Sequence, residues 1–233
     1  MACWLALCVT VLPVRALAGE PVDVALVLVS DVSRSINPSE YELQKGGYFA
    51  AFTDARVIAA IRGGAVGAIA VSYVEFAGDG DVATVLPWTV LRDAATARAF
   101  AERLRAAPRS FSGRTSISTG LRQAMAELAG WGGGEDVRRV IDVCGDGTNN
   151  SGEDVATARD AAVAAGAVIN GLAIISDHPV SWTFAHVQPP GGLDNYYRNH
   201  VTGGPGSFVL QVHDFASFGE AITRKLLQEI ASK

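Results

Sequence analysis

Stretches in which almost every position is apolar recur along the chain and are separated by segments with helical spacing. Residues 24–29 are apolar throughout, and residues 68–76, 139–144 and 167–174 are mostly apolar. Unbroken apolar runs of this length are typical of strands buried on both faces of a parallel sheet. The pattern therefore predicts four central strands.

A short polar turn follows the second of these strands. Residues 78–81 have the sequence Gly-Asp-Gly-Asp, and residues 82–90 return as a further strand. So close a return indicates an antiparallel hairpin. Residues 207–212 are predicted as the sixth strand.

The segments between the strands carry helix signals. Asn37 is followed by Pro38 and Glu40, which is a typical helix start, and the helical pattern continues to about residue 62 with a break near Asp54. Further helices are predicted over residues 94–106, 116–128 and 153–165, and over a last segment with one apolar face. Because helices alternate with strands, we expect a single α/β domain whose sheet is covered on both faces.

The first 18 residues have the features of a secretory signal peptide. Residues 2–13 are uncharged and largely apolar, and Ala-Leu-Ala at 16–18 forms a small-x-small cleavage site before Gly19. The run is too short for a membrane span, and no later stretch is long and apolar enough for one. We therefore expect a signal peptide over 1–18, one domain over 19–233, and a periplasmic or secreted protein.

Composition narrows the class of protein. The chain is 49% hydrophobic and 18% charged, which excludes disorder. Its net charge of -5 argues against a nucleic-acid binder, because such proteins carry an excess of basic residues. Cleavage at residue 18 leaves Cys144 as the last of three cysteines, so no intramolecular disulfide can form, and we expect this cysteine to be buried. Glu75 and Asp142 lie within predicted strands, where we expect paired polar groups.

Candidate chemistry gathers where predicted strands end. Asp31, Ser33 and Ser35 follow the first strand at alternate positions, so their side chains can point the same way. Asp146 follows the strand at 139–144, and Thr115 stands just before a predicted helix. Carboxylate and hydroxyl oxygens are the ligands that Mg²⁺ or Mn²⁺ prefers. If the sheet is doubly wound, these loops meet in the crevice where strand order reverses.

These five residues, in this order, resemble the metal-ion-dependent adhesion site of von Willebrand factor A domains. The resemblance covers nearly the whole mature chain. It implies a doubly wound, mostly parallel six-stranded sheet with an antiparallel edge strand and helices on both faces. The sequence around the motifs also resembles that of a bacterial family of exported A-domain-like proteins of unknown function. The similar stretches are residues 85–88, 139–143, 169–172, 196–199 and 203–206.

The resemblance also implies roles for the five residues. Ser33 and Ser35 would bind a divalent cation directly, and Thr115 directly or through water. Asp31 and Asp146 would act mainly through waters. One coordination position would remain for an acidic side chain of a partner protein. The cation is expected to be Mg²⁺, with Mn²⁺ or Ca²⁺ as alternatives, and the protein is expected to be an interaction module and not an enzyme.

A magnesium-dependent phosphohydrolase is the alternative. Residues 145–150, Gly-Asp-Gly-Thr-Asn-Asn, are close to the Gly-Asp-Gly-x-Asn-Asp motif of haloacid dehalogenase-like phosphatases, and Asp31 could imitate their nucleophile. Their chemistry requires a second acid two residues later, where this chain has Ser33. The phosphate-binding lysine of those enzymes has no counterpart either, because no lysine lies between Lys45 and Lys225, although an arginine could take its place.

The segment from 176 to 205 is long and irregular, and such insertions are often functional. It contains residue types that are enriched in binding hot spots: Trp182, Phe184, Tyr196, Tyr197 and Arg198. We therefore expect this segment to determine partner choice; the alternative is that its aromatic residues pack the loop onto the domain.

Overall fold

The predicted strands form one six-stranded sheet in the computed structural model, which describes residues 19–132, 134, 136–175 and 189–231. The strands are β1 (Val24–Asp31), β2 (Ile69–Phe76), β3 (Val82–Leu91), β4 (Arg138–Gly145), β5 (Ala167–Ile174) and β6 (Val209–Val212). Their order is β3-β2-β1-β4-β5-β6, and β3 alone is antiparallel to its neighbour. The predicted fold class is confirmed; the sixth strand is two residues shorter than expected.

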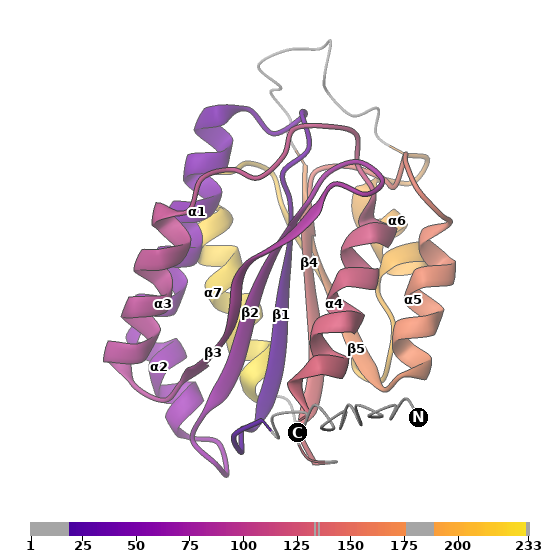
Figure 1. Ribbon diagram of the computed structural model, residues 1–233. Coiled ribbons are helices and arrows are strands. Elements are labelled where there is room, and N and C mark those ends of the chain that lie inside the picture. The colour runs from indigo at the N-terminus through magenta and orange to yellow at the C-terminus, as the bar shows by residue number, and fades with distance from the viewer. Residues whose placement is uncertain (1–18, 133, 135, 176–188, 232–233) are drawn as a thin grey trace, which may run out of the picture.

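Helices cover both faces of the sheet (Figure 1). On one face lie α1 (Pro38–Thr53), α2 (Ala55–Arg62), α3 (Ala94–Ala106) and α7 (Phe218–Ala231). On the other lie α4 (Ile117–Trp131), α5 (Val155–Ala164) and the short α6 (Leu193–Tyr196), which continues into a π-helical turn, η1 (Tyr197–Val201). Within the described residues, no helix is long and apolar enough to cross a membrane.

The continuous apolar run of β1 follows from its central position. Every residue of this strand is buried. Val24, Leu26 and Leu28 pack into the core beneath α1, α3 and α7, whereas the alternate residues pack beneath α4 and α5. Because helices cover both faces of the strand, both sets of side chains are apolar as far as Val29; Ser30 and Asp31 follow at its carboxyl end.

Local signals set the ends of the first two helices. The Asn37 side chain accepts a hydrogen bond from the Glu40 N–H, and the Glu40 carboxylate accepts one from the Asn37 N–H. Asp54 ends α1 and caps α2 through its hydrogen bond from the Arg56 N–H. The predicted cap and the predicted break are both confirmed.

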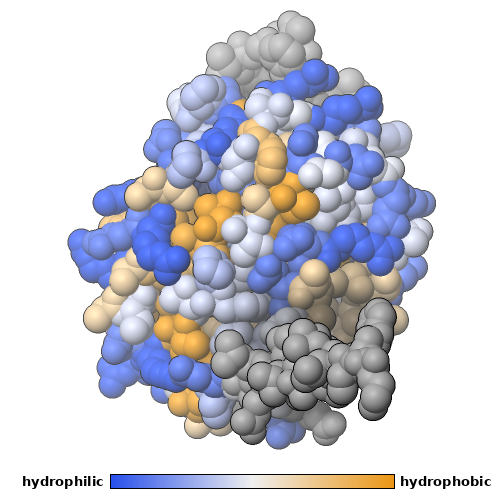
Figure 2. Space-filling model, viewed as in Figure 1, coloured by the Kyte–Doolittle hydropathy of each residue, from blue (hydrophilic) through white to orange (hydrophobic). Residues whose placement is uncertain are grey.

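The antiparallel strand β3 is an exposed edge of the sheet. Figure 2 shows the face that carries this edge, where apolar side chains reach the surface in separate patches between hydrophilic ones. Pro87 lies exposed within the strand and cannot donate a backbone hydrogen bond. Such a residue protects an edge against pairing with another chain.

A buried charge network joins α7 to β4. The Lys225 ammonium lies 2.6 Å from Asp142 Oδ1 and 2.7 Å from Glu229 Oε1, and all three side chains are fully buried. Burial opposes the charge of Lys225, but the two carboxylates hold its pKa above the ordinary value. Burial and the Asp142 charge raise the pKa of Glu229 to about 7, despite the contact with Lys225. Asp142 is therefore paired, as expected.

Cys144 belongs to the same buried region. Its thiol donates to Asp142 Oδ1 at 3.1 Å, and the residue has no exposed surface. Burial raises the pKa of this thiol well above its ordinary value. The prediction of a buried cysteine is confirmed.

Candidate metal centre

The strand order creates a crevice at the carboxyl ends of β1 and β4. The chain leaves β1 toward β2 on one side, and β4 pairs with β1 on the other. Loops from these two strands therefore diverge, and a crevice opens between them. The loops that follow β1 and β4 and the loop that precedes α4 lie together at the upper end of the molecule in Figure 1.

The five predicted residues lie together at this point. Thr115 Oγ1 donates to Ser33 Oγ at 3.1 Å, and Ser33 Oγ lies 3.1 Å from Ser35 Oγ. Ser35 Oγ donates to Asp146 Oδ1 at 2.8 Å. The Ser33 N–H donates to Asp31 Oδ1 at 2.7 Å, which joins the second carboxylate to the set. We call Asp31, Ser33, Ser35, Thr115 and Asp146 the candidate metal centre.

Exposure increases from one side of the candidate metal centre to the other. Asp31, Ser33 and Thr115 are buried, with exposed fractions of 0%, 1% and 1%. Asp146 is 9% exposed, and Ser35 is only half-buried. An incoming ligand would therefore reach the centre from the side of Ser35 and Asp146.

The surroundings of Asp31 disfavour its ionised form. Burial, and then the charge of Asp146, raise its pKa to about 8, although hydrogen bonds from Ser33 and the Arg109 charge act in the opposite direction. Its Oδ2 is buried and has no hydrogen-bond partner among the described residues. Two carboxylates near three hydroxyls, with one acceptor unsatisfied, are a donor set that fits a hard divalent cation.

The candidate metal centre is not a cluster of carboxylate, imidazole or thiol groups alone. Among the described residues, no three or more His, Cys, Asp and Glu side chains form a group that could hold a metal ion. The candidate metal centre differs from such a cluster because hydroxyl oxygens supply most of its donors.

Arg109 holds two of the loops together. One guanidinium nitrogen donates to the carbonyl oxygens of Val32 and Ser33, at 2.5 and 2.6 Å, and Nε donates to Phe111 O at 2.9 Å. The Arg34 N–H also donates to Gly113 O at 3.0 Å. The sequence does not indicate this role of Arg109, because its partners are backbone carbonyls, which leave no sequence signal.

Glu75 anchors the same loop from β2. Its Oε1 accepts from the Tyr41 hydroxyl at 2.7 Å and from the Tyr73 hydroxyl at 3.2 Å. Its Oε2 accepts from the Ser110 N–H at 2.8 Å. The expected pairing of Glu75 is confirmed, and the residue fixes the loop that leads to Thr115.

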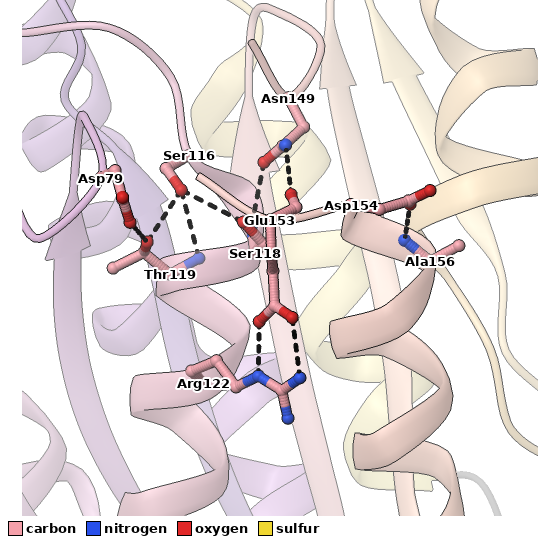
Figure 3. Close-up of polar contacts among 9 residues, drawn as sticks. All are labelled: Asp79, Ser116, Ser118, Thr119, Arg122, Asn149, Glu153, Asp154 and Ala156. Atoms are coloured by element: carbon pink, nitrogen blue, oxygen red, sulfur yellow. Dashed lines mark hydrogen bonds and ion pairs between the residues drawn. The ribbon is translucent and has the colours of Figure 1, made fainter. Parts of the chain in front are cut away.

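The loop after β4 fixes Thr115 and the start of α4. The Asn150 side chain accepts from the Thr115 N–H at 3.0 Å, and the Asn150 N–H donates to Thr115 O at 2.9 Å. Figure 3 shows the neighbouring contacts, in which Asn149 Oδ1 accepts from the Ser118 N–H at 3.1 Å. Arg122 and Glu153 close the same region with bonds of 2.6 and 2.9 Å (Figure 3). Both asparagines of the phosphatase-like motif thus hold the backbone around Thr115.

The structure corrects part of the expectation for segment 176–205. Tyr197 is fully buried and cannot contact a partner. Tyr196 is half-buried, and its hydroxyl accepts from the Asn149 N–H at 3.1 Å. Arg198 is exposed and pairs with Asp194 at 3.1 Å. Residues 176–188, which include Trp182 and Phe184, lie outside the described residues, as does the predicted signal peptide over 1–18.

The order of the strands and the helices on both faces give the chain the fold of a von Willebrand factor A domain. It is similar to proximal thread matrix protein 1 from the mussel byssus, solved with a zinc-occupied metal-ion-dependent adhesion site. The TM-score is 0.65 and the identity 18%, over 90% of this chain and 48% of the mussel protein. This chain therefore spans about half of that protein's length.

Two bacterial structures have the same fold. The pilus adhesin SpaC from Lactobacillus rhamnosus GG matches with a TM-score of 0.58 and 16% identity, over 91% of this chain and 31% of the adhesin. The conserved hypothetical protein BatB from Bacteroides thetaiotaomicron matches with a TM-score of 0.51 and 20% identity, over 90% of this chain and 100% of BatB. At these identities the likeness concerns the fold alone.

The family of the chain follows from a sequence model. A model described as "Protein of unknown function (DUF1194)" matches residues 21–233, and the chain belongs to this family. A search of curated proteins finds no match.

Proposed function

We propose that this protein is an exported interaction module that binds a divalent cation at the candidate metal centre and uses it to hold a partner protein. One observation carries the proposal: five oxygen-bearing side chains from three separate loops converge, while the buried Asp31 Oδ2 has no partner. A cation at this point would offset the repulsion between Asp31 and Asp146 and favour the ionised form of the buried Asp31.

The donor set supports particular roles. Ser33 and Ser35 would bind the cation directly, Thr115 directly or through water, and Asp31 and Asp146 mainly through water. Hard oxygen donors favour Mg²⁺, with Mn²⁺ and Ca²⁺ as alternatives. Hydroxyl ligands are neutral, so the bound cation would keep much of its charge for an external carboxylate. A partner's Asp or Glu side chain is therefore the ligand that we propose.

The structure offers less support for phosphate-ester hydrolysis. Ser33 stands where the second acid would be needed, and its hydroxyl is engaged with Ser35 and Thr115. Asn149 and Asn150 bind backbone groups around α4 and Thr115. We therefore propose a binding role without catalysis.

The predicted signal peptide supports export to the periplasm or the medium. Mass spectrometry of the protein isolated from its native cells should show a chain that begins at Gly19. Recovery of a chain that retains Met1 in the cytosol would contradict this part of the proposal.

Capture of partners should depend on the metal and on Ser33. The wild-type domain, immobilised in Mg²⁺ and exposed to an extract of the periplasm, is expected to retain proteins that are released by a chelator. Ser33→Ala should lose them, because it removes a direct ligand. Prior coupling of the extract's carboxyl groups to an amine should also abolish capture.

Ser39→Ala is the matched control for that experiment. The Ser39 hydroxyl is exposed and donates to Asn37 Oδ1 at the start of α1, and Ser39 is not one of the five candidate ligands. This variant should capture the same proteins as the wild type. Retention in chelator, or equal capture by the two serine variants, would refute metal-dependent binding.

A further inference from the structure

Two buried polar atoms at the candidate metal centre have no hydrogen-bond partner among the described residues. One is Asp31 Oδ2 and the other is the hydroxyl of Tyr197. Both side chains are fully buried. Leaving such a group unsatisfied costs free energy, so two of them in one place call for an explanation.

Gly145 brings the two atoms to the same small space. A Cβ built on Gly145 would lie 2.7 Å from the Tyr197 hydroxyl oxygen and 3.1 Å from Asp31 Oδ2. Both atoms therefore line the volume that a side chain at this position would occupy. Glycine is the residue that leaves this volume free, at the end of β4 immediately before Asp146.

A second glycine makes room for the ring of Tyr197. A Cβ built on Gly171 would lie 2.8 Å from Tyr197 Cδ1. Gly171 lies on β5 opposite Val143, two residues before the pair formed by Gly145 and Ala173. Because alternate residues of a strand share a face, the two glycines lie on the same face of the sheet. The Tyr197 side chain thus lies across β5 and β4, with its ring over Gly171 and its hydroxyl over Gly145.

The chemistry of the two groups is complementary. A phenol donates a hydrogen bond, and an ionised carboxylate offers two acceptor oxygens. The Ser33 N–H already occupies Asp31 Oδ1 at 2.7 Å, which leaves Oδ2 as the acceptor on the side of Tyr197. A hydroxyl bond to a charged carboxylate is stronger than one between neutral groups.

We infer that Tyr197 is a positioning residue of the candidate metal centre, whose hydroxyl donates to Asp31 Oδ2 when the centre holds its cation. This inference rests on the proposed function. It adds a fourth segment, η1, to the three loops that carry the ligands. It also explains why a buried tyrosine, and not a phenylalanine, occupies this position.

The test compares Tyr197→Phe with the wild type in two measurements. Calorimetric titration with Mn²⁺ alone is expected to show about 10-fold or more weaker binding, within the range of about 10–100-fold for groups that orient metal ligands. Denaturant titration of the metal-free protein is expected to show no loss of stability, because the hydroxyl makes no bond there and its removal relieves a buried polar group.

Tyr73→Phe provides the matched control. Tyr73 is also fully buried, but its hydroxyl donates to Glu75 Oε1 at 3.2 Å. Without it, Glu75 keeps its bonds from the Tyr41 hydroxyl and the Ser110 N–H, so the loop that leads to Thr115 stays anchored. This variant should lose stability and keep its Mn²⁺ affinity, the opposite of the result expected for Tyr197→Phe.

The outcomes separate this inference from the function on which it rests. Unchanged Mn²⁺ affinity in Tyr197→Phe, with normal binding by the wild type, would overturn the positioning role and leave the proposed function intact. A loss of metal-free stability without a loss of affinity would assign the hydroxyl to packing and also overturn the inference. Absence of Mn²⁺ binding by the wild type would overturn both.

Discussion

Lys225→Met is expected to lower the free energy of unfolding by about 3–5 kcal/mol, the range for removing one partner of a buried ion pair. Lys225 is the cation of a fully buried network, 2.6 Å from Asp142 and 2.7 Å from Glu229. Its loss leaves two carboxylates in an apolar environment without a positive charge. Denaturant-induced unfolding of the wild type and the variant measures the difference.

Lys45→Met is the control, because it makes the same change at a lysine whose acidic partner is exposed to solvent. Lys45 is also largely buried, but its partner Glu42, at 3.0 Å, is 66% exposed and stays solvated without it. The control should lose about 1 kcal/mol or less. Adding Glu229→Gln to Lys225→Met should recover part of the loss by removing one buried charge. Equal losses in the two lysine variants would disprove the role of the network.

Asp31→Asn is expected to abolish stabilisation by metal. A cation present at a hundred times its dissociation constant should raise the unfolding free energy of the wild type by about 2.7 kcal/mol. If the substitution weakens binding a hundredfold, about 0.4 kcal/mol remains at the same concentration. Burial raises the pKa of Asp31, so a neutral amide of the same size is expected to preserve the fold. Thermal unfolding with and without Mg²⁺ or Mn²⁺ measures the response.

Asp154→Asn is the matched control for the loss of charge. Asp154 caps α5 through its bond from the Ala156 N–H at 2.7 Å (Figure 3). Asparagine caps helices as well as aspartate does, so stability should hold and the metal response should remain. A response that disappears in Asp154→Asn but persists in Asp31→Asn would contradict the assignment and place the metal site at the start of α5.

Much of the fold could be predicted because the sheet leaves strong local signals. A strand covered on both faces is largely apolar, as residues 24–29 show, and Asn37 and Asp54 cap helices with their own side chains. The five residues of the candidate metal centre could be proposed because they stand at the ends of such strands or helices. Their contacts with one another depend on the strand order, which makes β1 and β4 neighbours and brings their loops together.

Features that depend on distant parts of the chain could not be predicted. Tyr197 has the composition signal of a binding residue, yet two glycines on other strands, Gly145 and Gly171, make room for it inside the domain. Lys225 and Glu229 lie on a helix predicted for its apolar face, and their partner Asp142 is on β4. No spacing or periodicity in the sequence connects residues so far apart.

A crystal of the domain grown with Mn²⁺ tests the metal centre most directly. Data collected at the manganese absorption edge locate the ion by its anomalous scattering. The proposed function predicts a peak at bonding distance from Ser33 Oγ and Ser35 Oγ, with Asp31 and Asp146 around it and one position open to the surface. A peak at another place, or none in a crystal soaked at saturating Mn²⁺, would contradict it.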